Sequence, residues 1–241
     1  MFTIHRTVSG SHCDCEGFLT IGAAMDFMQD CSLFQIDSER ELSAYFKENN
    51  CGMYVTSRQA NFYRRPAYGE RLTVSTWVYE VNALFGFRNT TITDEEGKIC
   101  AASYAMGAFV DLDKARTVRI PKELIGSIVT EEKLDMEYLP RKIILPEVSP
   151  EEMPAITVPR AYIDRNRHMN NAKYITAAAE YLPEDFETVR LRVEYKTAAR
   201  QGDTIYPNIY KQNGAVTVAL NGSGTTYAII EFIEKESVQY G

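Results

Sequence analysis

Cysteine is scarce in this sequence, and its positions exclude several kinds of chemistry. The chain has 241 residues and five cysteines, none of them after residue 100, and the odd count fits a reducing compartment better than a disulfide framework. Cys13 and Cys15 are too closely spaced for a zinc knuckle and no second pair follows them, so the sequence predicts no metal site. A thiol nucleophile for the second half would have to come from the first.

Long apolar runs and an excess of positive charge are also missing. No stretch is long enough to span a bilayer, and residues 1–6 show no basic region followed by an apolar run, so we expect no signal peptide and a cytoplasmic location. A net charge of −7 argues against general nucleic-acid binding. With 45% hydrophobic and 24% charged residues, the composition is typical of a soluble protein of one large or two ordinary domains.

Positive charge nevertheless gathers at one place. Arg190, Arg192, Lys196 and Arg200 surround the single acid Glu194. One interpretation is a solvated strand face. The other is a docking site for an acidic partner or a phosphate-bearing carrier, because complementary charge speeds encounter. On the second interpretation Arg190 and Arg192 are candidate substrate-binding residues.

Proline and acidic residues mark a boundary in the chain. Five of the nine prolines lie between Pro140 and Pro159, in a region with little hydrophobic periodicity. Such a segment is typical of a stiff linker. We therefore predict a linker at 128–154 between an N-terminal domain at 1–127 and a C-terminal domain at 155–238.

The two halves repeat the same order of elements. Thr20 is expected to cap a largely apolar helix that begins at Ile21, and the apolar face from Asn171 to Leu182 predicts a second helix that Pro183 ends. Strands follow each helix, at 55–63, 72–81, 85–93 and 99–110, and at 191–195, 204–210, 215–220 and 225–233. This order predicts an α+β fold with an antiparallel sheet wrapped around a long central helix in each half, so that the duplicated chain mimics a symmetric dimer.

The stretch after Tyr162 carries the strongest chemical signal. In an extended segment side chains two apart point to the same side, so Asp164, Asn166 and His168 are expected to converge. The helix that follows would direct its free N–H groups and its positive end to the same place. An acid, an amide, an imidazole and a helix N-terminus are the groups needed to hydrolyse an acyl compound. The alternative for His168 is a solvated loop histidine.

The surroundings of this stretch suggest substrate contacts. Asn170 and Asn171 open the second helix and are candidate substrate-binding residues, although a structural role for the Asn171 amide is equally expected. The matching segment of the first half, 13–18, has no imidazole, so we expect that half to hold an acyl chain instead. Met25 and Met28 are the candidate lining of that pocket, and an ordinary core is the alternative.

These residues resemble a known family. The active-site motif of the acyl-ACP thioesterases of plant plastids and bacteria is similar to the pattern Asp164-x-Asn166-x-His168-x-Asn170-Asn171-x-Lys173-Tyr174. The N-terminal domain of that family resembles the first half in the order and spacing of residues 56–58, 65–70, 76–78 and 119–121. The resemblance covers nearly the whole chain.

The resemblance implies two tandem hotdog domains and hydrolysis of fatty acyl thioesters in fatty acid biosynthesis. It implies catalytic roles for Asp164, Asn166 and His168, and a partner in acyl carrier protein, which holds the acyl chain on a phosphopantetheine arm. No cofactor and no membrane partner are expected, and a homodimer is compatible with this reading.

The sequence departs from the plant pattern at one place. Where plant members carry a Glu-Cys pair, this chain has Ala198-Ala199. The general base is therefore left open among His168, Asp164 and another carboxylate such as Glu194.

The mechanism that we expect is direct attack of water on the thioester. The alternatives are a hotdog hydrolase of acyl-CoA, a non-catalytic sensor of acyl thioesters and a hotdog dehydratase. The preferred length of the acyl chain depends on the depth of a pocket, which the sequence does not reveal.

Overall fold

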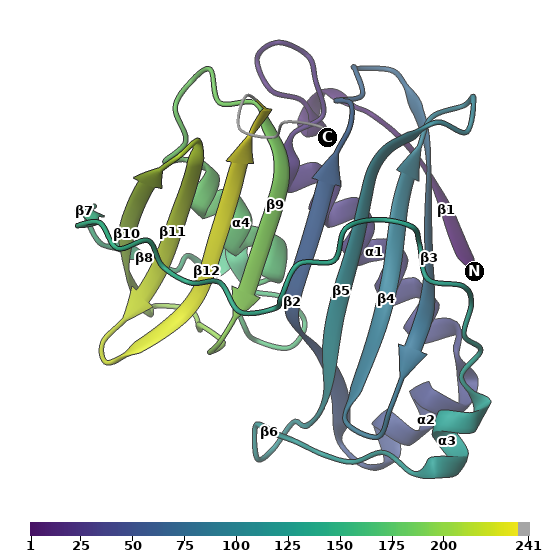
Figure 1. Cartoon of the computed structure of the whole chain (residues 1–241). Coiled ribbons are helices and arrows are strands. Elements are labelled where there is room, and N and C mark those ends of the chain that lie inside the picture. Colours follow the sequence, from purple (N-terminus) through teal and green to yellow (C-terminus); the bar gives the residue numbers. More distant parts are fainter. Residues whose placement is uncertain (236–241) are drawn as a thin grey trace. The chain divides into compact units, whose positions relative to one another are not determined.

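The chain folds into two compact units, each with a helix against a sheet (Figure 1). The computed structural model describes residues 1–235. The N-terminal unit consists of residues 1–58 and 63–138, and the C-terminal unit consists of residues 59–62 and those from 139 onward.

The boundary between the units falls inside the segment predicted as the linker, 128–154. Residues 128–138 belong to the N-terminal unit and residues 139–154 to the C-terminal unit. The last residues of the predicted C-terminal domain, 236–238, lie outside the described residues.

The N-terminal unit is built on an antiparallel meander. Its strand order is β1-β3-β4-β5-β2, with the short strand β6 on β5. The strands are β1 (Phe2–Thr7), β2 (Cys51–Phe62), β3 (Arg71–Val81), β4 (Phe85–Thr93), β5 (Ile99–Asp111) and β6 (Arg116–Thr117). The helices are the 3-10 turn η1 (Gly10–His12), α1 (Ile21–Ser38), α2 (Arg40–Glu48) and α3 (Lys122–Ser127).

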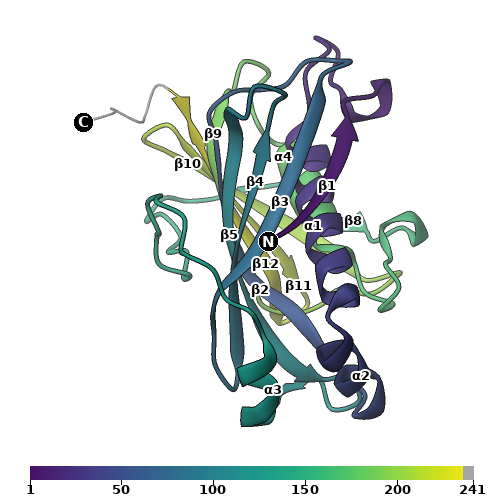
Figure 2. The ribbon, with the colours of Figure 1, turned by 90° about the vertical axis from the view of Figure 1, so that its right-hand side faces the viewer.

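Helix α1 forms because its first turn is capped and most of its surface is apolar. The Thr20 side chain accepts a hydrogen bond from the Ala23 N–H at 3.2 Å, as the sequence predicted. The helix lies along β3 and β4 (Figure 2), and its buried side chains occupy a wide face rather than a narrow stripe. They are Ala23, Ala24, Met25, Phe27, Met28, Cys31, Ser32 and Gln35.

The C-terminal unit repeats the plan with a shorter helix. The strand order is β9-β12-β11-β10, and two short strands, β7 and β8, pair with β10. The elements are β7 (Glu151–Glu152), β8 (Ile156–Thr157), the 3-10 turn η2 (Arg160–Tyr162), α4 (Asn171–Ala179), β9 (Thr188–Tyr195), β10 (Thr204–Gln212), β11 (Ala215–Gly222) and β12 (Thr225–Glu234).

Two predictions about local structure have different outcomes here. Asn213 and Gly214 have φ values of 50° and 68°, which is the left-handed geometry of the tight hairpin predicted at this dipeptide. Helix α4, by contrast, ends at Ala179, because the Leu182 N–H bonds the Ala179 carbonyl in a closing turn. Pro183 therefore follows a turn and does not end the helix as predicted.

The duplication extends to individual hydrogen bonds. In the N-terminal unit the Gly69 N–H bonds the Val8 carbonyl at 2.8 Å, and in the C-terminal unit the Gly202 N–H bonds the Val158 carbonyl at 3.0 Å. Both glycines have a φ of 86°, where a residue with a Cβ would be strained. The two turns predicted to match are thus the same structure.

The linker is held by hydrogen bonds to a strand in each unit. In the N-terminal unit, the Trp77 indole donates to the Glu132 carbonyl at 2.8 Å. In the C-terminal unit, the Arg192 guanidinium bonds Glu231 at 2.8 Å and the carbonyls of Pro140 and Lys142 at 2.6 and 3.2 Å. Arg192 therefore pins the linker to β9 and β12.

We expect the Arg192→Met substitution to lower the free energy of unfolding by about 2–3 kcal/mol, because it removes charge-assisted hydrogen bonds and leaves the Glu231 carboxylate largely buried without its cation. Urea denaturation would measure the change. Lys211→Met is the matched control, since Lys211 pairs with Glu151 at an exposed site and its loss should cost less than about 1 kcal/mol. Equal effects of the two substitutions would contradict the role given to Arg192.

Candidate active site

The segment that carries Asp164 and His168 is a closed turn, which corrects the extended geometry expected from the sequence. The Asp164 N–H bonds the His168 carbonyl at 2.9 Å, and the Arg167 N–H bonds the Asp164 carbonyl at 3.0 Å. Arg167 has a φ of 61°, as the reversal of the chain requires. The three predicted catalytic residues therefore lie on one tight turn and not along an extended strand.

The Asp164 carboxylate stabilises this turn. Its Oδ1 accepts the N–H groups of Asn166 at 2.8 Å and His168 at 3.4 Å. An aspartate that bonds the backbone two residues ahead is typical of turns, because its short side chain reaches without strain. Asn166 is exposed on the turn and His168 is half-buried. One oxygen of Asp164 is thus committed to the backbone.

The turn leads directly into helix α4. Asn170 is the N-cap, and its Oδ1 accepts the Ala172 N–H at 2.9 Å. The Met169 N–H bonds the Ala199 carbonyl at 2.8 Å, and the Asn170 N–H bonds the Tyr162 carbonyl at 2.8 Å. The imidazole is carried two residues before this cap, beside the positive end of the helix. The predicted substrate residue Asn170 thus has a structural role.

Two tyrosines hold the helix start against the sheet. The Tyr195 hydroxyl donates to the Asn171 carbonyl at 2.9 Å, and the Tyr174 hydroxyl accepts the Ala199 N–H at 2.7 Å. Burial raises the pKa of Tyr174 to about 12, so it stays a neutral hydroxyl. The backbone of Asn171 is therefore fixed against the sheet.

The segment Ala198-Ala199 lies beside this turn. Ala199 is fully buried and bonds Met169, the residue that follows His168. The positions at which the plant relatives were expected to carry an acid and a thiol hold methyl groups. Neither position supplies a base.

Glu194 faces the other side of the sheet. Neighbouring residues of a strand point to opposite faces, and Tyr195 reaches α4 whereas the Glu194 carboxylate accepts the N–H of Ile143 in the linker at 3.3 Å. Glu194 is also paired with Lys196 at 3.5 Å. Its place on the linker face removes it as the base for a reaction at His168.

The N-terminal unit contains the same turn without the same side chains. Asp14 Oδ1 accepts the N–H groups of Glu16 and Phe18, both at 3.0 Å, and Gly17 has a φ of 85°. Thr20 caps α1 as Asn170 caps α4. Phe18 stands where the C-terminal unit has His168, so the turn is a common scaffold and the imidazole is particular to one copy.

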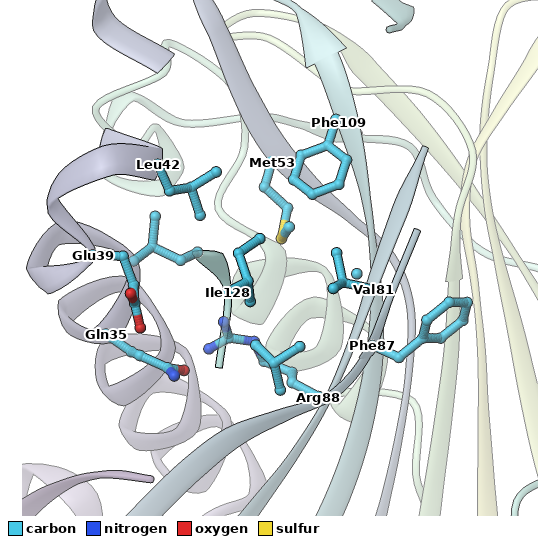
Figure 3. Close-up of a pocket in the computed structure, with 12 residues that line it drawn as sticks. Gln35, Glu39, Leu42, Met53, Val81, Phe87, Arg88, Phe109 and Ile128 are labelled. Carbon is cyan, nitrogen blue, oxygen red and sulfur yellow. The ribbon is translucent and has the colours of Figure 1, made fainter. Parts of the chain in front are cut away.

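A pocket opens in the N-terminal unit (Figure 3). It holds about 410 Å³ of empty space including its mouth. Its walls come from α1, α2, the sheet and the end of α3, with Gln35, Ile36, Glu39, Leu42, Met53, Val78, Val81, Gly86, Phe87, Arg88, Phe109 and Ile128 as the lining. Sequence reasoning did not single out these residues, because they come from segments far apart in the chain.

The predicted pocket residues lie elsewhere on the same helix. Met25 and Met28 are fully buried about two to three turns before Gln35 and are not part of this lining. They have the burial of ordinary core residues, which was the alternative interpretation.

The predicted basic patch is only partly open. Arg192 has 14% of its side chain exposed and is engaged with Glu231 and the linker, and Arg190 is half-buried. Because the Arg192 guanidinium already bonds Glu231 and two linker carbonyls, this residue is poorly placed to bind a carrier.

Within residues 1–235, no group of three or more His, Cys, Asp or Glu side chains could hold a metal ion. Among the same residues, no helix is long and apolar enough to cross a membrane.

Family profiles match both parts of the chain. The profile of the acyl-ACP thioesterase N-terminal domain matches residues 2–128, and that of the acyl-ACP thioesterase C-terminal domain matches residues 147–233. A search of curated proteins finds no match.

Solved structures share the fold over almost the whole chain. An acyl-ACP thioesterase from Bacteroides thetaiotaomicron is 23% identical with a TM-score of 0.83, and each chain is covered to 96%. The 12:0-ACP thioesterase from Umbellularia californica is 16% identical with a TM-score of 0.84 and 96% coverage of both chains. A putative oleoyl thioesterase from Lactobacillus plantarum is 20% identical with a TM-score of 0.83, covering 96% of this chain and 94% of its own. This likeness confirms the predicted α+β hotdog fold.

We expect the Asp164→Ala substitution to lower the free energy of unfolding by about 1–2 kcal/mol, because two backbone N–H groups lose their acceptor. Asp164→Asn keeps an amide oxygen in the same place and should be close to wild type in urea denaturation.

Asp14→Ala is the matched substitution in the other copy of the turn. It should cost at least as much, since Asp14 also pairs with Arg65. If Asp164→Ala left stability unchanged while Asp14→Ala lowered it, the two turns would not share a structural role.

Proposed function

The chain belongs to the acyl-ACP thioesterase family and hydrolyses acyl-ACP thioesters, and we propose that His168 directs water at the thioester carbonyl from the turn that Asp164 closes. One observation carries this proposal. The two units share the turn, but at the last position of the turn the C-terminal copy has the imidazole of His168, where the N-terminal copy has Phe18.

His168 is the proton acceptor in this proposal. The imidazole takes a proton from the attacking water and returns it to the sulfur of the carrier as the C–S bond breaks, so that the free acid and the carrier thiol are released. General base catalysis of this kind contributes about 10²–10⁴-fold. Glu194 faces the linker, and Ala198 and Ala199 carry no titratable group, so none of these three positions supplies the base.

Asp164 is a positioning residue in this mechanism. Its Oδ1 accepts the backbone N–H of His168 and so sets the direction in which the imidazole leaves the turn. The proposal therefore assigns Asp164 to geometry and His168 to proton transfer.

The developing oxyanion needs donors. Asn166 is exposed on the turn, and its side-chain amide can donate a hydrogen bond to the oxyanion. The positive potential at the N-terminal end of α4 favours the same negative charge. The N–H of Ala172 is already taken by the Asn170 side chain, so a helix donor would come from Asn171. Each good donor to the oxyanion contributes on the order of 3 kcal/mol.

The pocket of the N-terminal unit is proposed to receive the acyl chain. Its lining is mostly aliphatic and aromatic, as the binding of an acyl chain requires. Release of free fatty acid from the carrier places the reaction in fatty acid biosynthesis, where it would end chain elongation.

The His168→Ala substitution is expected to lower kcat/KM for acyl-ACP by about a thousandfold, because the water loses its base. His168→Phe is the matched variant, since Phe18 already occupies the equivalent turn position, and it should fold normally and be equally inactive. Release of free fatty acid, measured by mass spectrometry, checks both. Wild-type rates in a folded His168→Phe protein would remove the site assignment.

Asp164→Asn is expected to keep kcat/KM within about tenfold of wild type, because the turn retains its acceptor, whereas loss of the general base would cost about 10²–10⁴-fold. Glu194→Gln should change kcat/KM less than threefold or so, since the residue lies on the linker face. The pH profile of kcat/KM distinguishes the assignments. A thousandfold loss in Asp164→Asn with normal stability would transfer the role of base to Asp164.

A further inference from the structure

The pocket of the N-terminal unit has a polar end that a purely aliphatic chain would not need. Most of the lining is apolar, with Leu42, Met53 and Phe109 among the side chains that surround the empty space (Figure 3). Gln35, Glu39 and Arg88 line the same space. Figure 3 shows these three side chains gathered at one side of the pocket.

Arg88 is held in place by the helix that carries Gln35. Its Nη1 donates to the Ser32 carbonyl at 3.3 Å, one turn before Gln35 on α1. Burial, together with the nearby positive charge of Arg58, lowers the pKa of Arg88 to about 10, which still leaves the guanidinium charged at neutral pH. The negative charge of Glu39 acts in the opposite direction. The polar end therefore contains a charged donor, with an acid in the same lining.

Gln35 is the unexplained residue of this group. It is 7% exposed, and its Oε1 is buried and accepts no hydrogen bond from any residue of the described chain. A buried amide oxygen without a donor costs free energy, so its presence calls for an explanation. The oxygen belongs to a side chain that lines the pocket.

We propose that this pocket binds acyl chains that carry a hydroxyl group, which donates its hydrogen to Gln35 Oε1 and accepts a hydrogen bond from the Arg88 guanidinium. The proposal rests on the proposed function, because it names the class of acyl chain that enters the same pocket. The Gln35 amide and the Arg88 guanidinium become specificity-determining groups for the hydrolysis.

A hydroxyl fits these partners better than other polar groups do. It is both a donor and an acceptor, so it satisfies the Gln35 amide in either orientation. A carboxylate has no hydrogen to donate and would face the oxygens of Gln35 and Glu39. A methylene at the same place would exclude water and would leave the Gln35 oxygen without a hydrogen-bond donor.

The test compares acyl-ACP substrates of equal chain length that either lack a hydroxyl group or carry one. In the second set, the hydroxyl stands at a different carbon in each substrate. A site built to bond a hydroxyl discriminates strongly against its absence, so the wild-type ratio of kcat/KM should favour one hydroxylated position by on the order of 10²-fold. In Gln35→Met, which keeps the length of the side chain, this ratio should fall at least tenfold or so while the plain substrate is still hydrolysed. Gln29→Met is the matched control on α1, because Gln29 is not part of the lining, and it should keep the wild-type ratio.

Thermal unfolding gives a second readout that is independent of catalysis. Gln35→Met should raise the Tm of the ligand-free protein by about 2–4 °C, because the unpaired oxygen is gone. The free hydroxylated fatty acid should raise the Tm of the wild type more than the plain acid does, and this difference should vanish in Gln35→Met.

Failures of the two proposals are distinguishable. If the wild type hydrolyses plain acyl-ACP but every hydroxyl position lowers kcat/KM and Gln35→Met leaves the ratio unchanged, the inference is overturned and the proposed function stands. Tighter binding of an ω-carboxyl acid than of the hydroxylated acids in calorimetry would also overturn it. If no acyl-ACP is hydrolysed, the proposed function fails, and binding of the free acids still tests the pocket.

Discussion

An aspartate that bonds the backbone of its own turn is the constraint on which both units depend. Asp14 and Asp164 each accept two N–H groups with one oxygen, and each turn then passes into a capped helix. In each unit, the residue after the turn donates its N–H to a loop between two strands. The Leu19 N–H bonds the Pro66 carbonyl, and the Met169 N–H bonds the Ala199 carbonyl. The start of each helix is thereby tied to its sheet through main-chain hydrogen bonds that do not depend on the side chains at the tip of the turn.

This arrangement explains how two copies of one structure came to differ in chemistry. The tip residues contribute little to the turn, so Phe18 and His168 can occupy equivalent places without altering it. The N-terminal copy has the longer helix and a pocket beside it, and the C-terminal copy has the imidazole. Only the scaffold had to be retained in both, which is why its aspartate has a structural role even where it belongs to the active-site motif.

Two charged residues of β9 bond the backbone of the linker. Arg192 and Glu194 both point to the linker face of β9, where one bonds carbonyls and the other bonds an N–H. A stiff, proline-rich segment has many backbone groups without partners of its own, and these strand residues supply them. A cluster of charge in the sequence therefore marks a packing surface here more than an open docking site.

The helices that begin at Ile21 and Asn171, most of the strand positions and the Asn213-Gly214 hairpin could be predicted from the sequence, and so could the family. Each of these depends on periodicity, caps or motifs that are local in the chain. The sequence did not reveal α2, α3 or β1. It also did not reveal the turn at Asp164, since a pattern of alternate polar residues suits a strand and an aspartate-closed turn equally. The face on which Glu194 lies, the use of Arg192 by the linker and the unpaired oxygen of Gln35 were decided only by tertiary structure. Each of these depends on which distant segment packs against a side chain, and that information is spread over the whole chain rather than written near the residue.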